Sequence, residues 1–258
     1  MEHFRAPKAR YDAVICDIDG CLGPESSRPL DAPALARIAA HNRRAIDAGD
    51  VPLLTVCSGR PQPFAEAMCR FLANDRVPCV AENGVWVYDP RDNRYLLDPA
   101  ILPEHLDAVA HVQAFVRSTY GPRGVIIQPG KTASVSLWHP DTPYLFSLIA
   151  PLRERIAVEG WPFRVSHTVA WINIDLAHVS KATGIDRLLR ESGLEPARLA
   201  GIGDSGSDRA IAERVAFFAA PANAHEELRP HAHYISPHEE IEGVLDILDR
   251  LADAPASP

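Results

Sequence analysis

The first 85 residues alternate short apolar runs with segments of helical periodicity, and this alternation most constrains the fold. The apolar runs "YDAVICDID" (11–19), "VPLLTVCSG" (51–59) and "VPCVAENG" (77–84) are bounded by turn residues, which indicates buried strands. Between them, residues 33–49 start at a proline and stop at a glycine, as helices often do, and residues 63–73 predict a second helix. Strands alternating with helices imply right-handed crossovers and a parallel sheet covered by helices on both faces.

The middle of the chain has a different pattern. Residues 85–97 predict a hairpin, and a unit of one helix and two strands then occurs twice, over 103–140 and over 142–176. Each of the segments 103–120 and 142–157 predicts one helix, and a Pro-Gly turn separates the first two strands. We expect an α+β insert of roughly 90 residues, which is a normal domain size.

The alternating pattern returns at Lys181. Helices are predicted over 181–192, 207–215 and 240–251, and strands over 198–204, 216–221 and 233–236. The expected organisation is therefore a core formed by residues 1–84 and 176–258, with a second domain, 85–175, inserted into it.

Two pairs of carboxylates fall just past the ends of predicted strands. Asp17 and Asp19 end the first strand, and Asp204 and Asp208 follow the strand after the insert. Ligands of parallel sheets bind beyond the carboxyl ends of the strands, so these side chains are expected to converge. Clustered carboxylates raise each other's pKa values unless a cation neutralises them. Mg²⁺ fits, because it needs few protein carboxylates and keeps coordination positions for water and phosphate.

Other polar residues are predicted at the same edge. Ser58 and Asn83 follow the second and third predicted strands, and Lys181 starts a helix, where the helix dipole disfavours a lysine. A metal, a lysine and a hydroxyl around a carboxylate are suited to phosphoryl transfer. A carboxylate can itself be the nucleophile of such a reaction.

Four motifs occur in order: "DIDGCL", "CSGR", "SKATGID" and "GDSGSD". Together they resemble the haloacid dehalogenase (HAD) superfamily of phosphatases, and specifically its Cof-like and sucrose-phosphatase-like branch. "AENG" before the insert and "PANA" after the fourth motif are similar to that branch as well, which includes archaeal-type phosphoglycolate and mannosyl-3-phosphoglycerate phosphatases. The resemblance implies an α/β, Rossmann-like core with an inserted αββαββ cap that determines substrate specificity.

The resemblance also implies roles for the acids. Asp17 would be the nucleophile and a metal ligand. Asp19 would protonate the leaving oxygen, activate water later, and bind Mg²⁺ through its backbone carbonyl. Asp204 would be a metal ligand, and Asp208 a ligand or a neighbour that orients one.

The same resemblance places two residues against phosphate. Ser58 would donate a hydrogen bond to the phosphate, and Lys181 would hold nucleophile and phosphate together. Gly59, beside Ser58, is expected to contact phosphate, and Arg60 and Asn83 are candidates for substrate contact that could also be surface or turn residues. The chain departs from the family pattern at Cys21, where threonine is usual, and at Ser207, where asparagine is usual.

Structural explanations exist for each motif taken alone. Asp-Gly pairs are common in turns, and Ser58 with Gly59 could be a helix cap. "DIDG" lacks the further acidic positions of a calcium loop. "GDSG" would make Ser205 the nucleophile of a serine protease, but the all-β pattern and disulfides of that family are missing. Asn223 is expected to cap a helix.

Residues of two further types are expected to be structural. The histidines 225, 231, 233 and 238 are irregularly spaced, so we expect a solvated surface there rather than a metal site. Tryptophans 138, 161 and 171 are expected to pack the cap sheet, with one of them available to line the substrate pocket.

The net charge limits the expected binding partners, and the cysteines limit the expected compartment. The net charge is −8 and no basic run occurs, which argues against nucleic acid and anionic membranes. No apolar run approaches the ~20 residues of a membrane span. Five cysteines, an odd number without zinc spacing, favour reduced thiols. The first ten residues show no apolar core of a signal peptide. A cytoplasmic location is expected, as monomer or dimer.

The predicted function is a Mg²⁺-dependent phosphomonoester hydrolase that acts through an aspartyl-phosphate. Its substrate would be a small phosphorylated metabolite, such as a sugar phosphate or phosphoglycolate. Two alternatives stay open: a phosphomutase similar to phosphomannomutase, and a non-catalytic ligand-binding protein on the same fold.

Overall fold

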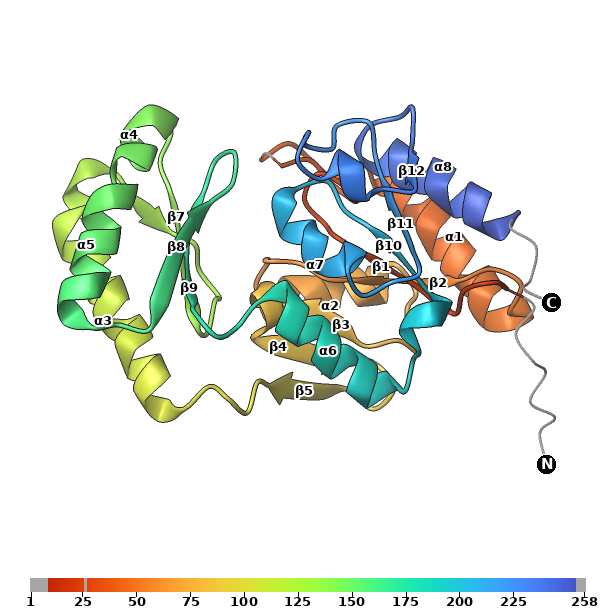
Figure 1. The fold of residues 1–258 in the computed structure, drawn as a ribbon, viewed down its shortest axis with the longest axis horizontal. Coiled ribbons are helices and arrows are strands. Elements are labelled where there is room, and N and C mark those ends of the chain that lie inside the picture. The colour runs from red at the N-terminus through yellow and green to blue at the C-terminus, as the bar shows by residue number, and fades with distance from the viewer. Residues whose placement is uncertain (1–8, 26, 254–258) are drawn as a thin grey trace.

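A five-stranded parallel sheet organises the larger part of the molecule (Figure 1). The computed structural model describes residues 9–25 and 27–253. The strand order is β12-β11-β10-β1-β2. The strands are β1 (Ala13–Cys16), β2 (Leu53–Val56), β10 (Leu199–Ile202), β11 (Phe217–Ala220) and β12 (Tyr234–Ile235). The sequence had predicted this parallel sheet, and the α/β fold class is confirmed.

Helices cover both faces of this sheet, and the alternating residues of β1 show how. Val14 and Cys16 pack in a cluster with residues of α1, α2 and α8, whereas Ala13 and Ile15 pack in another with residues of α6 and α7. Both faces of β1 are therefore apolar, which explains its unbroken hydrophobic run. The helices are α1 (Ala32–Ala48), α2 (Gln62–Phe71), α6 (Lys181–Ser192), α7 (Arg209–Ala212) and α8 (Glu240–Ala252).

The third predicted strand does not extend the parallel sheet. β3 (Cys79–Ala81) pairs antiparallel with β4 (Trp86–Asp89), which pairs with β5 (Arg94–Leu97) in a separate three-stranded sheet. A single parallel bridge, Cys57 to Val80, links β3 to the segment after β2. The cause is local, because Glu82, Asn83 and Gly84 all have positive φ and turn the chain back on itself. The predicted hairpin over 85–97 is confirmed.

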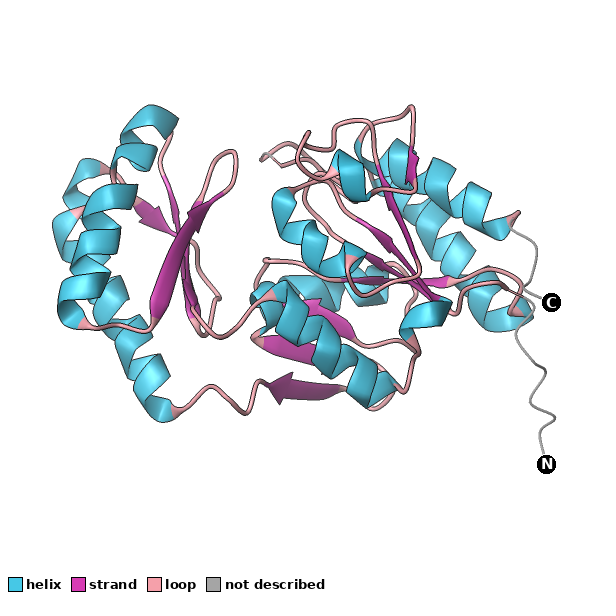
Figure 2. Cartoon of the chain, in the orientation of Figure 1, coloured by secondary structure: helices cyan, strands magenta, loops and turns pink. Residues whose placement is uncertain are grey.

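The insert forms its own antiparallel sheet, in the order β6-β7-β9-β8. Figure 2 shows its helices on the side away from the rest of the molecule, so the other face of the sheet is turned toward the core. The strands are β6 (Ile126–Ile127), β7 (Ser134–Trp138), β8 (Phe163–His167) and β9 (Ile172–Leu176), and the helices are α3 (Pro103–Thr119), α4 (Thr142–Ser147) and α5 (Ile149–Glu159). The duplicated helix-strand-strand pattern is thus present.

The segment 142–157, predicted as one helix, is two helices that meet at Leu148. Pro151 explains the break, because it has no N–H to donate to the carbonyl of Ser147 and its ring crowds that turn. Short 3₁₀ turns complete the described fold: η1 (Glu82–Gly84), η2 (Gly121–Arg123), η3 (Pro196–Arg198), η4 (Gly206–Asp208) and η5 (Arg229–His231).

The predicted domain division, at 84/85 and 175/176, stays a prediction. Val87 and Tyr88 of the hairpin pack in the two clusters of the parallel-sheet core, whereas α3, α4 and α5 share a separate cluster with the insert sheet. We therefore propose that the hairpin belongs with the core and that the insert begins after it. Within the described residues, no helix is long and apolar enough to cross a membrane.

Candidate active site

The loop after β1 brings two strand ends into contact. The backbone N–H of Asp17 donates to the carbonyl of Ile202 at 3.0 Å, which continues the β1–β10 pairing beyond the strand. Gly20 then turns the chain with φ +76°, and its N–H donates to the carbonyl of Gly23 at 2.7 Å. A Cβ at position 20 would lie 2.0 Å from Asp204 Oδ2, so glycine is required for both conformation and space.

Three carboxylates converge at this edge, as the sequence predicted. The exposed fractions of Asp17, Asp204 and Asp208 are 6%, 2% and 0%. One oxygen of each lies within 4.8 Å of the others. Lys181, the first residue of α6, is buried beside them, and its Nζ donates to Asp17 Oδ2 at 2.7 Å and Asp208 Oδ1 at 2.6 Å.

This cluster has more negative than positive charge. Burial, followed by the charge of Asp208, raises the pKa of Asp17 to about 7. Burial, followed by Asp208 and Asp17, raises the pKa of Asp204 to about 9. Burial alone would lower the pKa of Lys181, but the charges of Asp17 and Asp208 outweigh it and hold that pKa well above its ordinary value. One lysine therefore does not neutralise three buried acids.

The donor set fits a hard divalent cation. Asp204 Oδ1 is buried and has no hydrogen-bond partner among the described residues. An orphaned buried carboxylate oxygen is costly unless a ligand satisfies it. The three side chains offer only oxygen, the donor that Mg²⁺ prefers. The arrangement thus has the charge deficit, the free oxygen and the donor chemistry of a site for a hard divalent cation.

Asp208 is the most constrained of the three acids. Its Oδ2 accepts hydrogen bonds, each of 3.1 Å, from the backbone N–H groups of Asp204 and Ser205 and from the hydroxyl of Ser205. Its Oδ1 accepts from Lys181. Ser207, in place of the usual asparagine, lies with its hydroxyl 3.0 Å from that of Ser205. Asp208 is thereby built to orient Asp204 and Lys181.

Asp19 lies apart from the buried cluster and pairs with Arg60. Both side chains are about one-quarter exposed, and Arg60 Nε lies 2.8 Å from Asp19 Oδ2, with a second, shorter contact from Nη2 to Oδ1. The guanidinium also stands over the ring of Phe64, 5.2 Å from its centroid. Asp19 and Arg60 therefore reach the cleft as an ion pair.

The remaining predicted site residues differ in their exposure to the cleft. Gly59 and Asn83 line the cleft, and a Cβ on Gly59 would lie 3.0 Å from Asn83 Oδ1. Ser58 is fully buried, and its hydroxyl oxygen accepts a 3.2 Å hydrogen bond from the backbone N–H of Arg60. Asn83 Nδ2 donates to Asp175 Oδ2 of the insert at 3.3 Å, so this residue joins the core to the insert.

The cleft has a volume of about 510 Å³ and is lined from both sides. From the core come Asp17, Asp19, Arg60 and Lys181, and from the insert Lys131, Arg164, Trp171 and Asp175 among others. Trp171 is thus the predicted pocket tryptophan, while Trp161 packs in the insert's apolar cluster.

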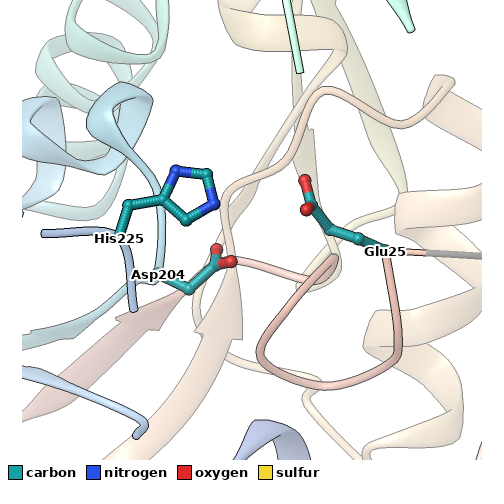
Figure 3. Close-up of side chains that lie close together, drawn as sticks. All are labelled: Glu25, Asp204 and His225. Atoms are coloured by element: carbon teal, nitrogen blue, oxygen red, sulfur yellow. The ribbon is translucent and has the colours of Figure 1, made fainter. Parts of the chain in front are cut away.

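Glu25 and His225 were missed as site residues. Figure 3 shows both side chains pointing toward Asp204, and ligand atoms of the three lie within 4.8 Å of one another. The prediction of a solvated surface is therefore wrong for His225, which lines the cleft. Its position five residues past the end of β11 was the signal, because that loop opens at the same sheet edge. Asp204 is common to both acidic groups.

Asn223 is not the N-cap residue of a described helix, contrary to the prediction, but its side chain contacts the start of α8 and the loop after β1. Its Oδ1 accepts a 2.7 Å hydrogen bond from the N–H of Glu240, the first residue of α8, and its Nδ2 donates to the carbonyl of Gly20 at 2.9 Å. The side chain therefore clamps the loop after β1. All five cysteines, including Cys21 in that loop, are free and buried.

Comparison with known proteins adds an independent line of support. A family model described as haloacid dehalogenase-like hydrolase matches residues 163–248, which include Lys181, Asp204 and Asp208. The phosphoglycolate phosphatase of Methanothrix thermoacetophila is 35% identical over 248 residues, which is 94% of this chain and 98% of that protein. The phosphoglycolate phosphatase of Haloarcula marismortui is 28% identical over 236 residues, or 90% and 94% of the two chains.

Solved structures agree on the fold. A haloacid dehalogenase-like hydrolase from Bacteroides thetaiotaomicron matches with a TM-score of 0.70 and 18% identity, covering 93% of this chain and 99% of that one. At this identity the likeness shows the fold alone. It includes both the core and the insert, since nearly the whole length of each chain is matched.

Proposed function

The chain belongs to the haloacid dehalogenase-like hydrolases and is a phosphatase of that family, and from this premise we propose that it hydrolyses small phosphate monoesters with Mg²⁺ through a phosphorylated Asp17. The observation that supports this most is the under-neutralised cluster of Asp17, Asp204 and Asp208 around Lys181, with one buried carboxylate oxygen unpartnered. A phosphate ester and a divalent cation together would complete its charge balance.

In this proposal Asp17, Asp204 and Asp208 would hold the ion, with Asp208 acting mainly by orienting Asp204. The bound Mg²⁺ would neutralise charge on the phosphate and on the carboxylates during transfer. Lys181 favours the ionised form of Asp17, because its ammonium donates directly to Asp17 Oδ2, although burial and Asp208 still raise the pKa of Asp17. We propose that the ammonium also reaches a phosphate oxygen, and that the hydroxyl hydrogen of Ser58 donates to another.

The reaction has two steps. A carboxylate oxygen of Asp17 forms a bond to phosphorus while the ester P–O bond breaks, and Asp19 donates a proton to the leaving alkoxide. Water then attacks phosphorus, Asp19 takes its proton, and the bond between Asp17 and phosphorus breaks to release phosphate. Both proton transfers use the carboxylate of Asp19, which is paired with Arg60. We therefore propose that the guanidinium moves from Asp19 onto the bound substrate.

We propose that the substrate is a small metabolite, and phosphoglycolate is the first candidate because the relatives are named for it. Gly59 and Asn83 would shape the substrate's end of the cleft from the core side. The insert would close over the organic part of the ester and exclude water. Cytoplasmic location and oligomeric state stay predictions.

The test is phosphate release from a panel of small esters, with Mg²⁺ and with excess chelator. Wild type is compared with Asp17→Asn and with Asp186→Asn, a matched control on the outer side of α6 that pairs with Arg214. We expect metal-dependent release by wild type and by the control, and none by Asp17→Asn. Isomerised sugar phosphate in place of free phosphate would indicate a mutase, and tight binding without turnover a non-catalytic protein.

A further inference from the structure

Lys131 is a cation in the cleft that contacts a neutral hydroxyl rather than a carboxylate. It follows the Pro-Gly turn between β6 and β7 and lines the cleft. Its Nζ donates to the hydroxyl of Ser136 at 2.6 Å, and that hydroxyl donates to Asn173 Oδ1 at 2.5 Å. Within the described residues, no carboxylate lies at ion-pair distance from it. Burial lowers the pKa of Lys131, as expected for an ammonium that donates to a neutral hydroxyl and not to a carboxylate.

The other cations lining the cleft are already engaged. Arg60 pairs with Asp19, and Lys181 is shared between two aspartates of the core. Arg164 donates to the carbonyls of Leu176 and Ala177 and lies 3.8 Å from Asp175. Among the described cleft residues, Lys131 is therefore the cation most in need of an anion. A partly buried charge is unfavourable unless it is paired, so an anion from outside the chain would be favoured there.

The fold fixes Lys131 with respect to the catalytic acids. Glu82, in the tight turn after β3, accepts hydrogen bonds of 2.8 Å from the backbone N–H groups of Thr132 and Ala133, and one of 3.0 Å from the hydroxyl of Ser134. On its other side, a Cβ on Gly130 would lie 3.5 Å from Cβ of Pro61, just before α2. The residues flanking Lys131 are thus attached to the core, and its ammonium is preorganised in the cleft that Asp17 also lines.

We propose that Lys131 binds a second anionic group of the substrate, and that it is the residue that selects phosphate esters that also carry a carboxylate. This inference rests on the proposed function, which places the phosphate at Asp17. Asp175, Glu82 and Asp19 also act electrostatically on Lys131. A singly charged carboxylate meets less repulsion from these acids than a second phosphate would, which is why a carboxylate is assigned. Ser136 and Asn173 supply polar groups beside it.

Two esters of similar size test the assignment. 2-Phosphoglycolate carries the carboxylate, and 2-hydroxyethyl phosphate replaces it with a neutral CH₂OH group. We expect wild type to prefer phosphoglycolate. Lys131→Met should lower kcat/KM for phosphoglycolate about 50-fold, the typical loss of one charge-assisted hydrogen bond. It should leave kcat/KM for the neutral ester within about threefold. Lys131→Arg should restore part of the preference.

The control variant is Arg117→Met, which removes a positive charge from the exposed face of α3 in the same insert and should change neither ester. Equal losses of kcat/KM on both esters with Lys131→Met would mean that Lys131 has a structural role. No loss on either ester would mean that Lys131 does not bind the substrate. Either result overturns the inference while leaving the phosphatase proposal intact.

A binding measurement separates this inference from failure of the proposed function. In the Asp17→Asn background with Mg²⁺, calorimetry compares phosphoglycolate binding with and without Lys131→Met. We expect about 50-fold weaker binding with Lys131→Met. An unchanged dissociation constant overturns the inference. A wild type that binds phosphoglycolate through Lys131 but releases no phosphate contradicts the proposed function alone.

Discussion

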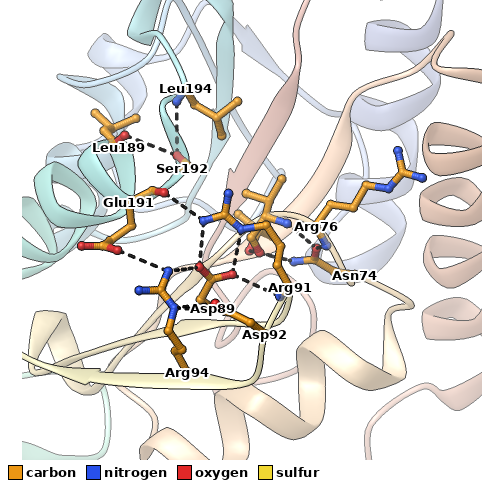
Figure 4. A network of polar contacts seen from close by, with 12 residues as sticks. Asn74, Arg76, Asp89, Arg91, Asp92, Arg94, Leu189, Glu191, Ser192 and Leu194 are labelled. Atoms are coloured by element: carbon orange, nitrogen blue, oxygen red, sulfur yellow. Dashed lines mark hydrogen bonds and ion pairs between the residues drawn. The ribbon is translucent and has the colours of Figure 1, made fainter. Parts of the chain in front are cut away.

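Buried acids at two places in this molecule, the hairpin and the cleft, differ in how far neighbouring cations neutralise them. Asp89, at the end of β4, is fully buried and accepts hydrogen bonds of 2.9 and 2.7 Å from Arg91 and of 2.9 Å from Arg94 (Figure 4). The hydrogen bonds from Arg91 lower the pKa of Asp89. In the cleft, three carboxylates share Lys181, and the pKa values of Asp17 and Asp204 rise to about 7 and 9.

The difference shows which acid cluster is complete. Both oxygens of Asp89 accept hydrogen bonds from arginines, whereas the cleft cluster lacks positive charge and has an orphaned oxygen on Asp204. The complete cluster also supports the incomplete one, because Arg91 donates to the carbonyl of Glu191 near the end of α6 at 2.8 Å. That helix begins with Lys181. A charge deficit, rather than acidity as such, distinguishes the candidate site.

The largest effect should follow from removing the cleft's lysine. Lys181→Met leaves Asp17 and Asp208 without their ammonium, so we expect kcat/KM to fall at least about 10³-fold. The free energy of unfolding of the metal-free protein should fall by about 3 kcal/mol, as for a buried ion pair that loses one partner. Phosphate release and denaturant unfolding measure the two effects.

The control for Lys181→Met is Lys131→Met, which removes another cleft lysine outside the acid cluster. Unfolding of that variant should be the less affected of the two, since its ammonium contacts only a hydroxyl. If Lys181→Met kept near-normal turnover, the picture of one indispensable cation among the three acids would be wrong.

The sequence predicted the acid cluster because topology alone brings it together. Asp17 and Asp204 each follow a strand of one parallel sheet, and parallel strands end at a common edge. The paired neighbours β1 and β10 bring both there, whatever the intervening chain does. Lys181 was predictable for a similar reason, since its helix starts where the chain re-enters the core.

What the sequence could not predict depends on side-chain contacts made across the chain. Lys131 is one lysine on an insert turn, and its isolation from carboxylates appears only when Ser136 and Asn173 are in place. The turn at Glu82 and Asn83 sent β3 into a second sheet, which strand periodicity cannot reveal because it does not encode positive φ at non-glycine residues.

The second largest effect should be a dependence of the Mg²⁺ affinity on pH. Mg²⁺ must displace protons from carboxylates whose pKa values are raised, to about 7 for Asp17 and about 9 for Asp204. Its apparent affinity should therefore rise between pH 6 and pH 8, by up to about tenfold per pH unit for each proton released. Calorimetry at several pH values measures the affinity, and thermal unfolding should show a larger rise of Tm with Mg²⁺ at pH 8 than at pH 6. A pH-independent affinity would contradict the charge deficit.

The third prediction compares Asp204→Asn with Asp89→Asn in metal-free protein at pH 8. The folded state holds a proton on Asp204 that the unfolded state releases above its pKa of ~3.9, so wild-type stability falls as pH rises toward 9. Asp204→Asn should remove this loss and raise stability by about 1 kcal/mol. The pKa of Asp89 is lowered, so its contribution is complete at pH 8 and is lost only as pH falls below ~3.9.

Asp89→Asn should therefore lower stability at pH 8, by about 2 kcal/mol, since charged hydrogen bonds are lost while the arginines stay partly solvated. Denaturant unfolding of both variants in excess chelator measures these two changes in the free energy of unfolding. Changes of the same sign in the two variants would refute the distinction between complete and incomplete clusters. With Mg²⁺ present, the gain of Asp204→Asn should vanish, because that variant replaces a charged carboxylate ligand with a neutral amide.

The smallest effect is expected for Arg94→Met. Arg94 is 44% exposed and shares its charge among Asp89, Asp92 and Glu191, so its removal leaves Asp89 with the bidentate contacts of Arg91. Exposed ion pairs contribute little, and we expect a loss of about 0.5 kcal/mol in unfolding with kcat/KM unchanged. Asp89 keeps the bidentate Arg91 and therefore tolerates such a loss, whereas the cleft, with one lysine for three acids, does not. Unfolding and turnover of Arg94→Met beside Lys181→Met measure that contrast, and a large loss of turnover in Arg94→Met would mean that the hairpin network positions α6 more tightly than its exposure implies.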